Sequence, residues 1–445
     1  MSLVKPVFPL LIVGIFLDSF QTKFSTGIHI INVFLLFFLL INWARKTDFS
    51  YRNQKLAGTE LIALLVFFLY LTLNANIFCC QEFGFRILLR LGYGIFLYVV
   101  FSKIDWSKVI TQLLYMLNFL NIFAGLLSIL GLINKDLWLK FWSILLSEQS
   151  YGLQLYEINR GRISVTFPVF MSIIASFAIM LSRNSKLQRI VGSLGMIFGM
   201  FSIIFWGYRS YIIATLAGIS IFLFLLERLK KLSKIKNNSS VLYVERFVVI
   251  IIPLLVIFHV LISNYFSVVN IVDRFMLVHS IDQRATAVRW DFLQNSIEMF
   301  SVSPLIGVGI GNSRIYQKPL DIHLVSSEGQ RLGANLFYLP IDPHNIFLEY
   351  LSETGIIGIF LMFLTLMIFL ITDLHLLRSL NVLDGSREKN YFAVAGLLAV
   401  LVSSWIFIFS VQFTSYTKSS LYLFFIFRGT IVSWRQRYSF GKFRI

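Results

Sequence analysis

The chain has 445 residues, of which 57% are hydrophobic and only 14% are charged, and its mean hydropathy is +0.77. Because a water-soluble domain averages about 25% charged residues, this composition excludes an ordinary soluble protein and indicates a polytopic membrane protein. The formal net charge of +17 could indicate a nucleic-acid-binding protein. The positions of the basic residues along the chain therefore have to be considered first.

Apolar stretches of membrane-crossing length predict about twelve transmembrane helices. The first stretch has one lysine and lacks the small-residue pattern of a signal-peptide cleavage site, so we expect it to be retained as a span. In chain order the stretches are residues 4–20, 27–43, 60–78, 87–101, 110–133, 163–181, 190–208, 209–226, 247–263, 345–372, 391–413 and 419–434.

The distribution of lysine and arginine predicts one orientation for these spans. With a cytoplasmic N-terminus, the basic residues gather in short joins on the cytoplasmic side, as the positive-inside rule requires. Both termini are therefore expected in the cytoplasm, with residues 264–343 outside it. The positive charge is then a consequence of topology, and no nucleic-acid partner is expected. The basic joins are 44–59, 102–109, 182–189, 227–246 and 373–390.

The predicted fold class is an all-α polytopic membrane protein in three parts. Residues 1–263 form an N-terminal bundle with an outside segment at 134–162, whose tryptophans suit the membrane interface. Residues 264–343 form a large extracytoplasmic loop between the ninth and tenth spans, and residues 344–445 form the C-terminal spans. No internal repeat of fixed period is present, which argues against a transporter built from duplicated halves.

A helix entry closes the large loop at Asp342-Pro343-His344-Asn345. Aspartate is a favoured N-cap and proline a favoured first helical residue, so a helix is predicted to begin here. Free backbone N–H groups then lie beside His344, and Glu349 follows as a polar residue in the first turns. A single histidine here can also be merely a polar residue at a membrane interface.

Two glycine patterns accompany this entry. Gly355 and Gly358 are three residues apart, so they remove side chains from one helix face and predict close packing by another helix. Upstream, Gly307, Gly309 and Gly311 predict a strained turn that would let the loop approach phosphate groups closely. Isolated glycines are also common in ordinary turns, so the prediction depends on both patterns together.

Together, the two patterns resemble the signature of the O-antigen ligase and O-antigen polymerase superfamily. The resemblance is specific over about residues 284–372, and elsewhere it amounts to the number of helices and the position of the large outside loop. The stretches that carry it are His344-Asn345 followed by Gly355-x-x-Gly358, and Arg289-Trp290 followed by Pro304-Leu305-Ile306-Gly307-Val308-Gly309-Ile310-Gly311-Asn312.

The resemblance implies a GT-C-like, metal-independent membrane glycosyltransferase without a cofactor. Its implied substrate is an undecaprenyl-diphosphate-linked oligosaccharide outside the cytoplasmic (inner) membrane. It further implies that His344 deprotonates the acceptor hydroxyl and that Arg209 and Arg289 bind the diphosphate. Arg284 remains an alternative to Arg289, because Arg289 directly precedes Trp290 where a longer gap is expected. Asn345, Glu349, Gly307 and Gly309 are then supporting residues.

The chemistry of glycan transfer independently favours these residue types. Breaking a bond to diphosphate leaves an anion, which a guanidinium binds with two parallel hydrogen bonds while staying charged. Histidine has an unperturbed pKa close to neutral, as a general base requires. Arg209 lies between two apolar stretches, where an unpaired charge is costly, although an arginine at a helix end can also extend its head to the interface.

Three functions remain after this reasoning. A polymerase would join lipid-linked repeat units, and we favour it weakly because of the span count and the second outside segment; a ligase would transfer finished glycan to lipid A-core. A lipid-linked oligosaccharide flippase would need charges along a central path, but most charges lie at the outer ends or in cytoplasmic joins, with Arg90 and Arg428 as the main exceptions.

The expected partners are membrane lipid and a chain-length regulator. No Asp-x-Asp motif is found in the first outside loop, and the histidines lack zinc-ligand spacing, so no metal site is expected.

Overall fold

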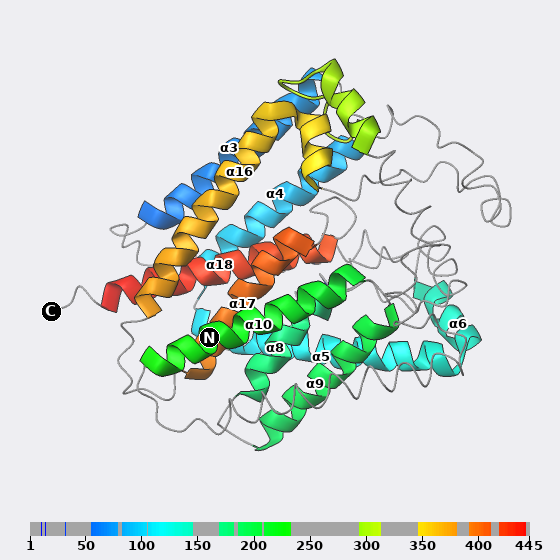
Figure 1. Cartoon of the computed structure of the whole chain (residues 1–445), viewed down its shortest axis with the longest axis vertical. Helices are drawn as coiled ribbons and strands as arrows, with labels where there is room; N and C mark the ends of the chain where they lie inside the picture. The colour runs from blue at the N-terminus through cyan, green and yellow to red at the C-terminus, as the bar shows by residue number, and fades with distance from the viewer. Residues whose placement is uncertain are drawn as a thin grey trace.

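The structure is a computed structural model, and the residues it describes form a bundle of helices (Figure 1). The regular secondary structure within this described part is entirely α-helical, as the composition predicted. The described residues are 55–78, 82–104, 106–145, 169–181, 186–206, 209–232, 293–312, 346–380, 391–410 and 418–441, with the single residues 10, 14 and 32.

The helices match the predicted spans closely wherever those spans are described. Apart from the single residues 10, 14 and 32, the predicted spans at 4–20, 27–43 and 247–263 lie outside the described residues, so the total of about twelve and the GT-C-like arrangement stay predictions. The named helices are α3 (Lys55–Ile77), α4 (Glu82–Lys103), α5 (Trp106–Ile133), α6 (Lys135–Leu145), α8 (Val169–Met180), α9 (Lys186–Trp206), α10 (Arg209–Leu232), α16 (Ile346–Leu380), α17 (Tyr391–Ser410) and α18 (Lys418–Gly441).

Five helices in the described part are long and apolar enough to cross a membrane. Their outward faces carry large apolar side chains, such as Leu69 on α3 and Phe360 on α16, which are about three-fifths exposed within the bundle. Such a surface is typical of helices in contact with lipid, because water-soluble proteins rarely expose large contiguous apolar patches. The candidate spans are Gly58–Ile77, Gly84–Lys103, Ile110–Ile133, Lys186–Ile204 and Phe347–Leu377.

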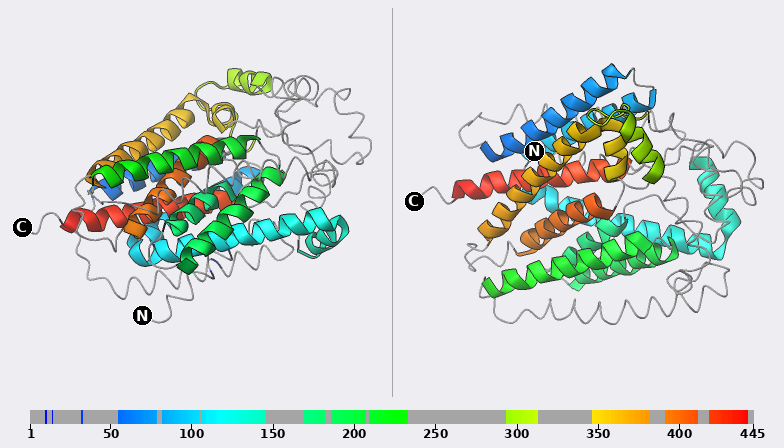
Figure 2. Two further views of the ribbon diagram at one scale, coloured as in Figure 1. Left: turned by 60° about the horizontal axis from the view of Figure 1, so that its bottom comes forward. Right: turned by 45° about the horizontal axis from the view of Figure 1, so that its top comes forward.

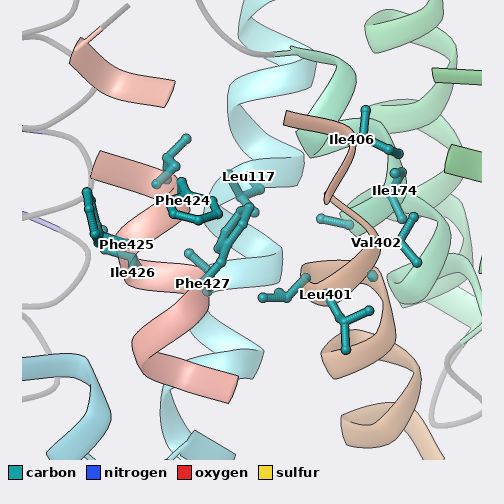
Figure 3. Packing of buried hydrophobic residues seen from close by; sticks show 14 of the residues in the cluster. Leu117, Ile174, Leu401, Val402, Ile406, Phe424, Phe425, Ile426 and Phe427 are labelled. Atoms are coloured by element: carbon teal, nitrogen blue, oxygen red, sulfur yellow. The ribbon is translucent and has the colours of Figure 1, made fainter. Parts of the chain in front are cut away.

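The buried core is formed by helices that are distant in sequence. Helix α18 packs along α4, and α5, α8 and α9 pack on one another, with α17 between α8 and α18. Figure 3 shows Phe424 and Phe427 of α18 beside Leu117 of α5, and Ile174 of α8 close to Val402 of α17. Helix α18 therefore packs mainly along α4, although it also contacts its sequence neighbour α17.

Helix α6 gives the described part of the predicted interfacial segment at 134–162. The Asn134 side chain caps it by accepting a hydrogen bond from the Leu137 amide at 2.8 Å. Trp138 and Trp142 are buried, with their rings edge to face at 5.7 Å, and α6 packs against α5. Figure 2 shows α6 at the end of the bundle away from the C-terminus.

Candidate active site

The structure describes four of the eight predicted site residues. Arg209 is the first residue of α10, three residues after the end of α9 at Trp206, so it lies between two helices as predicted. The N-terminal end of a helix attracts anions through its free N–H groups. Glu349 is in the first turn of α16, and Gly307 and Gly309 lie in the turn that follows the helical residues 293–302.

The other predicted site residues lie outside the described residues, so their roles stay predictions. They are His344, Asn345, Arg284 and Arg289.

Helix α16 is interrupted at Gly355, where φ is 65° and ψ is −167°. The break leaves the carbonyl groups before Gly355 and the N–H groups after it without partners inside the helix. The Val308 amide donates to the Ser352 carbonyl at 3.0 Å, and the Gly309 amide donates to the Glu353 carbonyl at 2.9 Å. The two broken ends of α16 are thus satisfied by residues 304–310.

The exchange of hydrogen bonds is reciprocal. The Ile356 amide donates to the Pro304 carbonyl at 2.9 Å, and the Ile357 amide donates to the Leu305 carbonyl at 3.2 Å. The two sequence patterns that carried the resemblance are therefore bound to each other through their backbones. We call this contact of residues 304–310 with α3 and α16 the loop dock; Figure 1 shows residues 293–302 beside the kinked start of α16.

Glycine is required at the loop dock because two backbones meet there. Gly307 has φ of 70°, and a Cβ added to it would lie 2.3 Å from the carbonyl carbon of Glu353. A Cβ on Gly355 would lie 2.4 Å from the carbonyl carbon of Leu305. Both positive φ values and both contacts exclude any side chain. The prediction of close approach was right for Gly355, but the partner is the loop and not another helix.

Gly358 fulfils the helix-packing prediction at the next position. A Cβ added to Gly358 would lie 3.0 Å from the ring of Tyr70 on α3, which packs along α16. The Tyr70 hydroxyl donates a hydrogen bond to the Thr354 carbonyl at 2.5 Å, one residue before the break. Helix α3 therefore supports the break in α16 directly.

Asn74 of α3 is the side chain that joins the loop to the helices. Its Nδ2 donates to the Ile306 carbonyl at 2.6 Å, and its Oδ1 accepts from the Ile310 amide at 2.8 Å. Our sequence analysis did not select Asn74 or Tyr70. A signal was present, because polar residues spaced four apart in an otherwise apolar span lie on one helix face.

We predict that Asn74→Leu loosens the loop dock. The substitution keeps the side-chain volume but leaves the Ile306 carbonyl and the Ile310 amide unpaired, which costs about 1–3 kcal/mol for each buried group. Amide hydrogen exchange of residues 306–310 should become about 5- to 150-fold faster. The matched control is Asn76→Leu, because Asn76 is exposed and, among the described residues, bonds the Thr72 carbonyl of its own helix. Equal exchange in both variants would contradict the assigned role of Asn74.

Two acidic side chains complete the described part of this region. Glu349 and Glu353 are both buried, at 7% and 4% exposure, in the short helical segment before Gly355. Carboxylates in the first turns are stabilised by the positive end of the helix dipole. Between them, the Tyr350 ring packs against Phe67 of α3 at 5.8 Å, which fixes the short segment against the bundle.

Residues 194–363 match the family model described as O-antigen ligase. The match supports a relationship to the O-antigen ligase and polymerase superfamily over this part of the chain. It runs from α9 through the loop dock into α16, so the matched segment includes Arg209, Arg284, Arg289 and His344. A search of curated proteins found no match to this chain.

The similarity to the O-antigen ligase family agrees with the helical structure. The apolar helices and the O-antigen ligase match together indicate a multi-pass protein of the inner membrane. The loop dock lies entirely within the matched residues except for its α3 contribution, Tyr70 and Asn74. The matched segment is thus completed by a helix from the N-terminal part of the chain.

Proposed function

We propose that this protein is a membrane glycosyltransferase that joins undecaprenyl-diphosphate-linked oligosaccharide repeat units into O-antigen or capsular polysaccharide outside the cytoplasmic membrane. The observation that supports glycosyl transfer is the O-antigen ligase match, because it contains the histidine, the arginines and both glycine patterns in one segment. The choice of a polymerase depends on the predicted span count and the second outside segment. The loop dock supports it, because the dock ties the segment around residues 304–312 to the start of α16, just after His344.

In the proposed reaction an acceptor sugar hydroxyl attacks the anomeric carbon of the donor glycan. A new glycosidic C–O bond forms, and the bond between the anomeric carbon and the diphosphate oxygen breaks. His344 takes the hydroxyl proton as general base. Undecaprenyl diphosphate leaves as an anion, and Arg209 with Arg289 or Arg284 stabilises the charge that develops on it.

The rigidity of the loop dock also suits this chemistry. Reaction of a diphosphate needs fixed donors in a site that does not rearrange during the step, since reorganisation would cost part of the stabilisation. A loop held to two helices by paired backbone hydrogen bonds supplies such rigidity. We propose that Gly307 and Gly309 contribute by allowing this close backbone contact.

A ligase is the second candidate function. The description of the matching family as O-antigen ligase favours it. Its acceptor would be lipid A-core in place of a second lipid-linked repeat unit, while the base and the diphosphate-binding arginines would have the same roles. The two functions therefore differ only in the acceptor.

The deciding experiment uses the purified full chain in liposomes. Supplied with a defined undecaprenyl-diphosphate-linked repeat unit alone, a polymerase yields a ladder of lengthening lipid-linked products. Supplied also with lipid A-core, a ligase transfers glycan to that acceptor and yields no ladder without it. Protein-free liposomes are the control. Absence of product under both conditions would contradict the proposed glycosyl transfer.

A further inference from the structure

A group of four charged side chains is buried among α3, α16 and α18. The Arg428 guanidinium donates from Nη1 to Asp373 Oδ2 at 2.5 Å and from Nη2 to Glu60 Oε1 at 3.2 Å. Arg435 donates from Nη1 to the same Glu60 oxygen at 2.9 Å. Arg428, Glu60 and Asp373 are each at most 2% exposed. We call these four residues the charge network.

The charge network is balanced and extends to further helices. Two carboxylates face two guanidinium groups, which offsets the cost of burying each charge alone. Tyr98 of α4 donates to Glu60 at 3.1 Å, and Trp405 of α17 donates to Asp373 at 2.7 Å. Thr372 of α16 donates to Glu60 at 2.5 Å. A single carboxylate on α3 is thereby bonded to α4, α16 and α18.

Close backbone packing joins α16 to α3 and joins α18 to α4. The link between α16 and α18 is made instead by side chains, through Arg428 and Asp373. Many side chains on the outward faces of α3 and α16 are apolar, and apolar contact with lipid does not fix how far one helix slides along another. Polar contacts between defined residues do fix the axial position of one helix relative to the other.

Helices α3 and α16 are joined by polar contacts at two positions along their length. At one end Tyr70 bonds Thr354 beside the loop dock, and at the other end Glu60 bonds Thr372. On α3, Glu60 belongs to the charge network and Asn74 belongs to the loop dock. At 1.5 Å per helical residue these two residues are about 21 Å apart along the helix. A slip of α16 by one turn, about 5.4 Å, would break the contacts at both ends.

We infer that the charge network is a positioning element that sets the axial register of α3 and α16 and thereby holds the loop dock at their opposite end. Arg428 suits this role because its planar fork reaches a carboxylate on each of the two helices at once. Its consequence for glycan transfer rests on the proposed function, whereas its consequence for the loop dock does not.

A pair of matched variants tests the inference. Thr372→Val removes the hydroxyl that bonds Glu60 and the Phe369 carbonyl of its own helix. Thr365→Val removes a buried hydroxyl on the same helix whose partner, among the described residues, is the Leu361 carbonyl. In the full chain in liposomes, Thr372→Val should make amide exchange of Val308 and Gly309 about fivefold faster or more, and Thr365→Val should leave it unchanged. Equal exchange at the loop dock in the two variants would overturn the inference.

Arg428→Lys provides a second test, because it keeps the charge but replaces the fork with a single ammonium group. We expect exchange at Val308 and Gly309 to rise about tenfold or more, with exchange in α5 unchanged. An equal rise in α5 would mean general loosening and would also overturn the inference. If this variant does not insert, the Thr372 and Thr365 pair decides.

Glycan transfer is measured on the same samples. Faster exchange at the loop dock with slower transfer supports both the inference and the proposed function. Faster exchange with transfer at the wild-type rate supports the inference and counts against a role of the loop dock in the reaction.

Discussion

Replacing His344 with alanine is expected to slow glycan transfer by about 10²- to 10⁴-fold, the usual contribution of a general base. The reason is that an acceptor sugar hydroxyl is a weak nucleophile until its proton is taken. Alanine removes the proton acceptor without removing the arginines that hold the diphosphate. The amount of inserted protein should be unchanged, and transfer is measured as glycan formed per inserted molecule in liposomes.

His375→Ala is the matched control for this substitution. His375 lies near the C-terminal end of α16, where it is exposed on the helix surface. It is far along α16 from the loop dock, so its loss should leave transfer at the wild-type rate. Full-length glycan made at the normal rate by His344→Ala would disprove the assigned base and with it the proposed mechanism.

Gly355→Ala is expected to break the loop dock and to reduce transfer about 100-fold or more, since a 1 Å misplacement of a site can cost that much. The added Cβ would lie 2.4 Å from the carbonyl carbon and oxygen of Leu305 and 2.6 Å from the Gly307 nitrogen. These are backbone atoms, so no side chain can rotate away, and the positive φ adds strain of about 1–3 kcal/mol. Either α16 straightens or residues 304–307 withdraw.

The measurements are the apparent melting temperature in detergent and the transfer rate in liposomes. Gly58→Ala on α3 is the control, because a Cβ there meets nothing within 4 Å and alanine favours a helix interior over glycine by about 0.5–1 kcal/mol. We expect the control to keep or slightly raise the melting temperature and to transfer normally. A Gly355→Ala protein that melts and transfers like Gly58→Ala would show that the contact at Gly355 is dispensable.

Much of the helical architecture could be predicted from the chain alone. The predicted span 110–133 corresponds to α5 at Trp106–Ile133, and 391–413 corresponds to α17 at Tyr391–Ser410. These predictions succeed because a membrane helix satisfies all its backbone groups within one segment, so its length and apolarity are visible locally. The positive φ of Gly307, Gly309 and Gly311 was also predictable, since few other residues adopt it.

The partners of these segments could not be predicted in the same way. The glycines at 307 and 355 were each recognised, but the sequence does not say that one backbone binds the other. Arg428 was noticed only as a charge inside an apolar span, and its partners Glu60 and Asp373 are 368 and 55 residues away along the chain. Helical periodicity relates residues within one helix, so it does not predict contacts between residues so far apart in the sequence.

The sequence by itself determined that this is a helical, multi-pass membrane protein and that its superfamily signature lies around the entry to α16. Hydrophobic length, glycine positions and the distribution of charge are properties of short segments, and they are the same before and after folding. Only the tertiary structure decided that α3 completes the loop dock and that one guanidinium joins α3 to α16. Those contacts exist because polar backbone and charged groups buried among apolar helices must find partners inside the protein, whichever segment supplies them.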